Sequence, residues 1–208
     1  MNKTKEKILD IAERLFGEQG YGATSLRQVI AEAGVNLAAV HYHFGSKEEL
    51  LDAVVLRGAS PLNEERIALF ERYEGEAAPA PVAVEKVLHA IVAPTFMKLK
   101  RSPQFAQLMG RLLGEGLMPG MLGRHFKPTV DRFIGAMRRS LPDLPQEELF
   151  WRIQFMFGAM AQTLLGRHLF PEELGGPADS SEVVDRLISF LAAGFQAPVP
   201  QFAKDQEK

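Results

Sequence analysis

The chain has 208 residues, of which 46% are hydrophobic, so it can bury a sizeable core and is not globally disordered. It contains no cysteine, which excludes a disulfide framework, a thiolate nucleophile and thiolate metal ligands. The net charge of −2 gives no overall indication of nucleic-acid binding, and no apolar run reaches the roughly 18 residues of a membrane span. The N-terminus also lacks the apolar region of a secretory signal, so we expect a cytoplasmic protein.

The first 45 residues are predicted to form three helices separated by glycine-containing turns. The first has an apolar stripe at helical spacing and ends at the glycines of "GEQGYG". The second spans about 25–33 and is stopped by Gly34. The third is very short, about 37–43, with Asn36 as its N-cap and Gly45 after its end.

The rest of the chain also follows the helical period. A long fourth helix starts at the capping box of Ser46 and Glu49, with a kink or break expected at Pro61. Further helices are expected near 82–100, 103–116, 120–141, 145–170 and 180–196. No segment alternates as a strand does. We therefore predict an all-α fold with an N-terminal three-helix helix-turn-helix domain (1–46), a C-terminal helical domain (47–196) and a frayed tail (197–208).

The third helix carries an uncharged face that a soluble protein rarely leaves exposed to water. This face consists of Leu37, Ala38, His41 and Tyr42. A second and third helix joined by a tight turn form a helix-turn-helix, whose later helix enters the major groove of DNA. Leu37 and Ala38 suit thymine methyl groups, and His41 suits a base edge or a phosphate. Taken alone, His41 and His43 would also fit as ordinary surface and core histidines.

Other side chains near this face suit the DNA backbone. The hydroxyl of Tyr42 and the ammonium of Lys47 can bind phosphates. Thr24 and Ser25 place hydroxyls and free N–H groups at a helix start, where anions bind. Arg27, one turn further on, can reach a guanine.

Residues 4–50 closely resemble the N-terminal domain of the TetR/AcrR family of bacterial transcriptional regulators. The shared motifs are "A…LF…G" in the first helix, "TSLR" opening the second, "AGV" in the turn and "YHFGSKEEL" leading into the fourth. The resemblance implies an all-helical C-terminal domain for ligand binding and dimerisation. It also implies DNA contacts at Thr24, Arg27, Asn36, Leu37, Ala38, His41, Tyr42, His43 and Lys47.

This chain departs from the family pattern at two of these positions. Many members have a polar or basic residue at position 37 and an aromatic one at 41, where this chain has Leu37 and His41. The operator sequence therefore cannot be taken over from relatives. The same stretch is similar to a branch with "GVN-AAVNYHFGSK", some of whose members respond to fatty acids or their thioesters.

The C-terminal half is rich in phenylalanine and methionine, which line adaptable apolar pockets but also fill ordinary cores. With a few polar groups among them, they predict a pocket for a small apolar ligand, acyl-like or aromatic. The candidate pocket residues are His89, Phe96, Phe105, Met109, Arg111, Phe126, Trp151, Phe155 and Gln162.

The last two expected helices are apolar on more than one side, which indicates a partner beyond the core of the same subunit. Two such helices from each of two subunits would form a four-helix bundle with two-fold symmetry. The candidate interface residues are Ala159, Leu164, Ala192 and Phe195. A homodimer would present recognition helices to major grooves about 34 Å apart, which requires a palindromic operator.

No catalytic motif for metal, serine or phosphate chemistry occurs in the sequence, and we expect neither enzymatic activity, nor a cofactor, nor a bound metal. The sequence predicts a ligand-inducible repressor that binds operator DNA as a homodimer. One alternative is a regulator whose C-terminal domain binds a protein partner, or only dimerises, without a small-molecule inducer.

Overall fold

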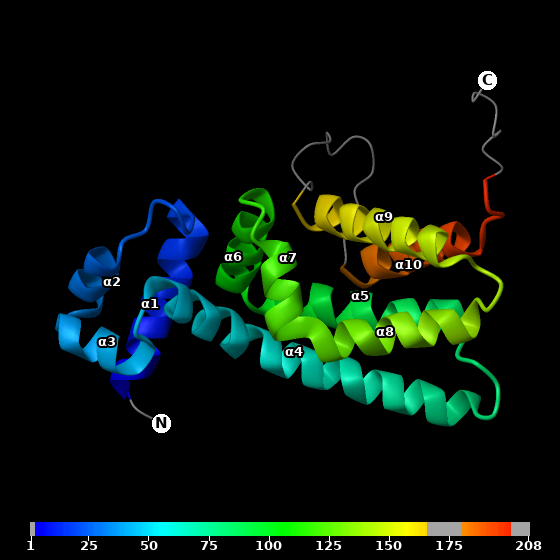
Figure 1. Cartoon of the computed structure of the whole chain (residues 1–208), viewed down its shortest axis with the longest axis horizontal. Helices are drawn as coiled ribbons and strands as arrows, with labels where there is room; N and C mark the ends of the chain where they lie inside the picture. Colours follow the sequence, from blue (N-terminus) through cyan, green and yellow to red (C-terminus); the bar gives the residue numbers. More distant parts are fainter. Residues whose placement is uncertain (1–2, 166–179, 201–208) are drawn as a thin grey trace, which may run out of the picture. The chain divides into compact units, whose positions relative to one another are not determined.

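The computed structural model describes residues 3–165 and 180–200, and it contains no strand in these ranges (Figure 1). The prediction of an all-α fold is confirmed. The elements in chain order are α1 (Lys3–Gln19), α2 (Leu26–Ala33), α3 (Leu37–Phe44), α4 (Lys47–Ala77), α5 (Val84–Arg101), α6 (Pro103–Gly114), α7 (Met118–Met121), the π-helix η1 (Leu122–Phe126), α8 (Lys127–Ser140), α9 (Gln146–Leu165) and α10 (Ser180–Gln196). Among these helices, none has the length and hydropathy needed to cross a membrane.

The limits of the N-terminal helices are set by local hydrogen bonds. The side chain of Asn36 accepts a bond from the third backbone N–H beyond it (2.8 Å), which satisfies a free donor at the start of α3. Gly34 ends α2 with φ 62°, a left-handed conformation that disfavours side chains. Ser46 and Glu49 exchange the two bonds of a capping box, at 2.8 and 3.1 Å. The caps predicted from the sequence are therefore confirmed.

Of the two alternatives expected at Pro61, a kink or a break, the break is wrong, and so is the expectation of one helix over 120–141. Pro61 lies inside α4, which continues to Ala77, so the proline does not end the helix. The single helix expected over 120–141 is instead divided into α7, the π-helical turn η1 and α8. π-Turns are rare in proteins, and many of those that occur lie at functional sites. The π-turn gives this segment a wider helical turn than its neighbours.

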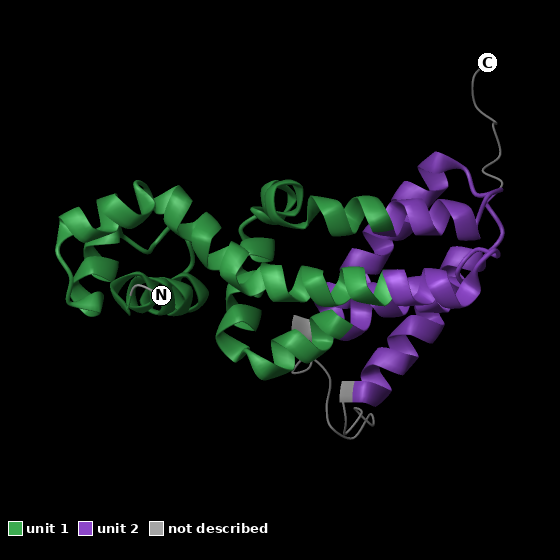
Figure 2. Cartoon of the chain, turned by 90° about the horizontal axis from the view of Figure 1, so that it is seen from below, with its two compact units in different colours: residues 1–70, 94–132 green, residues 71–93, 133–208 purple. Residues whose placement is uncertain are grey.

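The chain divides into two compact units (Figure 2). Unit 1 comprises Met1–Phe70 and Pro94–Arg132, and unit 2 comprises Glu71–Ala93 and Phe133–Lys208. This division differs from the boundary after residue 46 that the sequence suggested. The reason is that α6 packs against α1, so the first helices share one unit with part of the later chain.

Hydrogen bonds fasten α6 to the end of α1 in unit 1. The guanidinium of Arg111 donates to the backbone carbonyls of Gly17 (3.2 Å) and Glu18 (3.0 Å). The carboxylate of Glu115 accepts from the backbone N–H of Tyr21 at 3.2 Å. Arg111, predicted to line a ligand pocket, is exposed and instead satisfies the last carbonyls of a helix.

Unit 1 has a continuous apolar core that extends from the N-terminal helices to η1. Its buried residues include Ile8, Leu15, Phe16, Val29, Val40, Phe44, Leu50, Val54, Phe105, Leu108, Leu112, Met121 and Phe126, and Met109 packs against them. Phe105, Met109 and Phe126 were candidates for a pocket lining. They belong to this packed core, which is the other role that the sequence allowed for phenylalanine and methionine.

Unit 2 has its own core, built from the adjoining parts of α4, α5 and α8 together with α9 and α10. Its larger buried members are Tyr73, Val87, Leu88, Phe133, Met137, Leu149, Met156, Met160, Leu187, Leu191 and Phe195. The helices α9 and α10 pack against each other within this unit (Figure 1).

Candidate nucleic-acid interface

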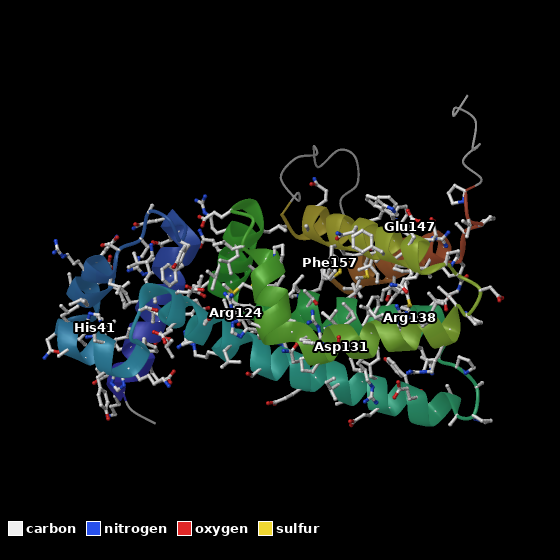
Figure 3. The ribbon with its side chains drawn as sticks, viewed as in Figure 1. His41, Arg124, Asp131, Arg138, Glu147 and Phe157 are labelled. Atoms are coloured by element: carbon white, nitrogen blue, oxygen red, sulfur yellow. The ribbon has the colours of Figure 1, made fainter. Side chains whose placement is uncertain are left out.

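The helix α3 buries one side and leaves the other open to solvent. Val40 and Phe44 lie in the core of unit 1. On the opposite side, Leu37 is 54% exposed and Tyr42 is 85% exposed, which are high values for large apolar or aromatic side chains. Ala38 and His41 are exposed beside them (Figure 3 labels His41). The structure therefore brings together the four residues of the predicted DNA-facing surface.

A backbone contact restricts the chemistry available to His41. Its Nδ1 lies 2.8 Å from the carbonyl oxygen of Gly45, so Nδ1 carries the proton and donates. In the neutral ring, Nε2 is then a hydrogen-bond acceptor. An acceptor in the major groove pairs with the amino group of adenine or cytosine, whereas a phosphate requires a donor. The geometry thus favours a base edge over a phosphate for neutral His41.

The polar residues at the starts of α2 and α3 serve first as helix caps. The hydroxyl oxygen of Ser25 accepts from the backbone N–H of Gln28 at 3.2 Å. Ser25 and Asn36 are both exposed, so the Ser25 O–H and the Asn36 amide N–H groups remain available as donors. Arg27 is exposed on the first turn of α2.

Lys47 is half-buried and held near the turn between α1 and α2. Its ammonium lies 3.4 Å from the carbonyl oxygen of Gly22 and 4.3 Å from the ring centroid of Tyr21. These contacts orient the side chain and connect the first residue of α4 to the N-terminal helices. His43 is half-buried and its ring lies edge-on to that of Tyr42, at a centroid distance of 5.0 Å.

Thr24 does not fit the predicted contact with DNA. Its side chain is only 1% exposed, and its hydroxyl donates toward the carbonyl oxygens of Gly20 (2.8 Å) and Leu15 (3.2 Å). The residue fastens the turn after α1 from inside. The family motif places a threonine here, and burial gives it a structural role in positioning α2.

We expect Thr24→Val to lower the free energy of unfolding by about 1–3 kcal/mol, because the buried hydrogen bond of the hydroxyl to the carbonyls is lost. Urea unfolding followed by circular dichroism measures this effect. Thr24→Ser keeps the hydroxyl and should retain most of the stability. Equal stability of the valine variant and the natural protein would contradict the role assigned to the hydroxyl.

Comparison with known proteins identifies the chain. A model of bacterial regulatory proteins of the tetR family matches residues 8–54, and a model of the tetracyclin repressor-like C-terminal domain matches residues 89–194. The chain belongs to the TetR family. Its members are transcriptional regulators with a helix-turn-helix that binds DNA, which agrees with the features of α2 and α3.

Relatives of the TetR-family chain include a transcriptional regulator, AcrR, from Shigella flexneri, with 32% identity over 89 residues; the match covers 43% of this chain and 40% of that protein. A putative tetR family regulator from Shewanella has a similar fold, with a TM-score of 0.67 and 15% identity, and the match covers 91% of this chain and 96% of that one. The regulator FadR from Bacillus subtilis, in complex with stearoyl-CoA, has a TM-score of 0.59 and 17% identity, covering 91% and 98%. The chain thus spans less than half the length of the Shigella protein.

Several candidate pocket residues of this TetR-family chain lie on its surface. Trp151, Phe155 and Gln162 are exposed on α9, so they do not line an enclosed interior. Phe96 is buried in unit 1. Because α9 has aromatic residues on two sides, its sequence does not indicate which side faces the core.

The candidate interface residues also need correction. Ala192 and Phe195 are 3% and 2% exposed and pack inside their own subunit. Ala159 is half-buried, and the side chain of Leu164 lies outside the described residues. Phe150 and Phe190, which are not among these four candidates, are instead exposed on α9 and α10. Only the tertiary structure shows that the side chains of Phe150 and Phe190 face solvent and not the core.

One groove of about 500 Å³ lies in unit 2, where the start of α5 meets the middle and end of α10. Of the predicted pocket residues, His89 lines it, and its Nδ1 lies 3.0 Å from the hydroxyl oxygen of Tyr73. Burial lowers the pKa of His89, aided by the charge of Arg72 and opposed by that of Asp185. A lowered pKa favours the neutral ring, and the Tyr73 hydroxyl also accepts from Arg72 at 3.0 Å.

Proposed function

We propose that this TetR-family protein is a repressor that binds a palindromic operator as a homodimer and releases it when a small ligand binds. The observation that carries the DNA-binding part is the exposed, uncharged side of α3, formed by Leu37, Ala38, His41 and Tyr42. Both helices of the motif have capped ends, so this surface is held rigid before DNA arrives.

The exposed side of α9 and α10 supports the homodimer. Phe150, Trp151, Phe155 and Phe190 are each about half exposed or more. Three of these rings are already ordered against one another, with centroid distances of 5.6 Å (Phe150 to Trp151) and 6.2 Å (Trp151 to Phe155). A cluster of rigid aromatic residues on a surface is typical of a protein interface. A second copy that offers the same surface would bury both clusters about a two-fold axis.

Release by a ligand requires a difference in affinity between two forms of the protein. A 100-fold loss of operator affinity corresponds to a coupling free energy of about 2.7 kcal/mol. By thermodynamic reciprocity, operator DNA then weakens ligand binding by the same factor. FadR of Bacillus subtilis was crystallised with stearoyl-CoA, which supports a small-molecule effector for this chain without specifying its class.

The palindromic arrangement of the operator is tested by selecting bound sequences from a random DNA library. The most enriched sequence is then footprinted with the bound protein. We expect two inverted half-sites whose centres are about 10 bp or one further helical turn apart. Binding should weaken steeply with salt, because phosphate contacts release counterions. A library without an enriched sequence, or with a single half-site that binds one subunit, would refute the proposal.

A further inference from the structure

An arginine is buried in unit 1 without an ion pair to any described residue. Arg66, in the middle of α4, is 8% exposed and forms no ion pair with any residue in the described ranges. Its one hydrogen bond there goes from Nη2 to the hydroxyl of Thr95, at 2.6 Å. Its Nε is buried and has no hydrogen-bond partner among the residues that the structure describes.

The charge of Arg66 persists in spite of its burial. Desolvation, opposed by the charge of the adjacent Glu65, lowers the pKa of Arg66 to about 10, which still leaves the guanidinium protonated at neutral pH. The ring of Phe126, the last residue of η1, covers it with a distance of 5.7 Å to the centroid. An aromatic face compensates a cation only weakly compared with a carboxylate.

Two other arginines of the chain show what a compensated site looks like. Arg152 is 6% exposed, and it donates to the carboxylate of Glu148 at 2.9 Å and to the carbonyl of Phe195 at 2.6 Å. Arg57, on the same helix as Arg66, contacts three carboxylates. A buried charge without such partners is costly, and an orphaned donor on it points to a ligand.

We propose that Arg66 binds the carboxylate of an effector with an apolar tail, which replaces the ring of Phe126 on the guanidinium. This inference rests on the proposed function and specifies the class of its ligand. A single guanidinium charge matches a monoanion, and its planar edge matches the two oxygens of a carboxylate. The apolar tail has the adaptable side chains of Met121 and its neighbours in the same core cluster to pack against.

The helices around Arg66 each contain a backbone irregularity. Pro61 removes one backbone donor from α4 a little over one turn before Arg66, and Pro94 precedes Thr95 in α5. Phe126 itself belongs to the π-turn η1. Prolines and π-turns leave local hydrogen bonds unmade, so a helix can bend there at lower cost than elsewhere. Space for a ligand can therefore open beside Arg66 without unfolding a regular helix.

A chain of hydrogen bonds leads from this site toward the start of α4. Asn63, one turn from Arg66, donates from Nδ2 to the carbonyl oxygen of His125 at 2.7 Å. The Nε2 of His125 lies 2.9 Å from Oδ1 of Asp52, and Nε of Arg124 lies 3.1 Å from the same oxygen (Figure 3 labels Arg124). Asp52 is a little over one turn beyond Lys47. Displacing Phe126 would thus move the two residues that precede it, Arg124 and His125. Both of these contact Asp52, in the part of α4 next to the DNA-binding helices.

The test is calorimetric titration of the full chain with decanoate and with 4-phenylbutyrate, each paired with its alcohol, 1-decanol or 4-phenylbutanol. We expect at least one carboxylate to bind at least about tenfold more tightly than its alcohol. Arg66→Met should remove that preference, and Arg66→Lys should keep part of it. The proposal fails if neither carboxylate binds, if acid and alcohol bind equally, or if Arg66→Met binds as the natural protein does.

Melting temperatures of the same proteins without ligand provide a second readout. Arg66→Met should melt at the same or a higher temperature, because it removes an uncompensated charge. Arg152→Met, the matched control, should melt several degrees lower, because it leaves Glu148 without its partner. A lower melting temperature for Arg66→Met would show that the arginine stabilises the fold, and it would overturn the proposal. Operator binding without ligand, measured on each protein, tests the repressor function separately.

Discussion

Replacing Phe155 and Phe190 together by glutamate is expected to produce a monomer with at least about 100-fold weaker operator binding. Both rings are largely exposed in the subunit, at 66% and 70%, so the change should not disturb its own core. In the proposed dimer, the substitution would place four carboxylates in an apolar seam, where unpaired charges are strongly disfavoured. A monomer has one recognition helix and loses the second half-site.

Analytical ultracentrifugation at micromolar concentration measures the oligomeric state, and fluorescence anisotropy measures operator affinity. The control is Leu113→Glu on α6, where an exposed apolar side chain (43%) outside the proposed interface is replaced by an acid. This control should remain dimeric. A natural protein that sediments as a monomer, or a double variant that remains a dimer, would refute the assignment of the α9 and α10 surface.

The second large effect is expected from Leu37→Glu at the start of α3. The side chain is 54% exposed, and an acidic residue in the first turn of a helix interacts favourably with its dipole. Stability should therefore be unchanged or slightly higher. On DNA, the carboxylate would meet the negative field of the groove and replace a side chain that suits a thymine methyl group. We expect operator affinity to fall at least about 100-fold.

Thermal unfolding and DNA titration on the same sample separate the two effects. Leu56→Glu provides the control, since Leu56 has a similar exposure (50%) but lies on α4 outside the helix-turn-helix. It should bind operator as the natural protein does. If Leu37→Glu retained its operator affinity, the exposed side of α3 would not be the surface that faces DNA.

Features that depend on neighbours in the chain could be predicted from the sequence. The caps at Asn36 and at Ser46, and the glycines that end α2 and α3, act over at most four residues. The helical period likewise identified which side of α3 is uncharged. The division of 120–141 at η1 could not be read in this way, because a π-turn differs from an α-turn by a single hydrogen-bond shift that composition does not encode.

The direction in which a side chain points depended on the tertiary structure. Thr24 looked like a phosphate ligand at a helix start, yet its hydroxyl is buried against backbone carbonyls. Phe195 looked like an interface residue and is a core residue, whereas Phe155, a pocket candidate, is exposed. These helices are apolar on more than one side, and periodicity alone cannot choose among the sides.

The sequence by itself determined the helical content, the helix-turn-helix and the family, because capping and amphipathic spacing are local and the family motif lies within 50 consecutive residues. The tertiary structure alone decided which residues share a core and which charge lacks a partner. Arg66 is an ordinary arginine in the sequence, and it becomes a candidate anchor only when Thr95 and Phe126, 29 and 60 positions away, enclose it without an ion pair to a described residue. Burial is a property of segments distant in the chain that pack together, so no local pattern encodes it.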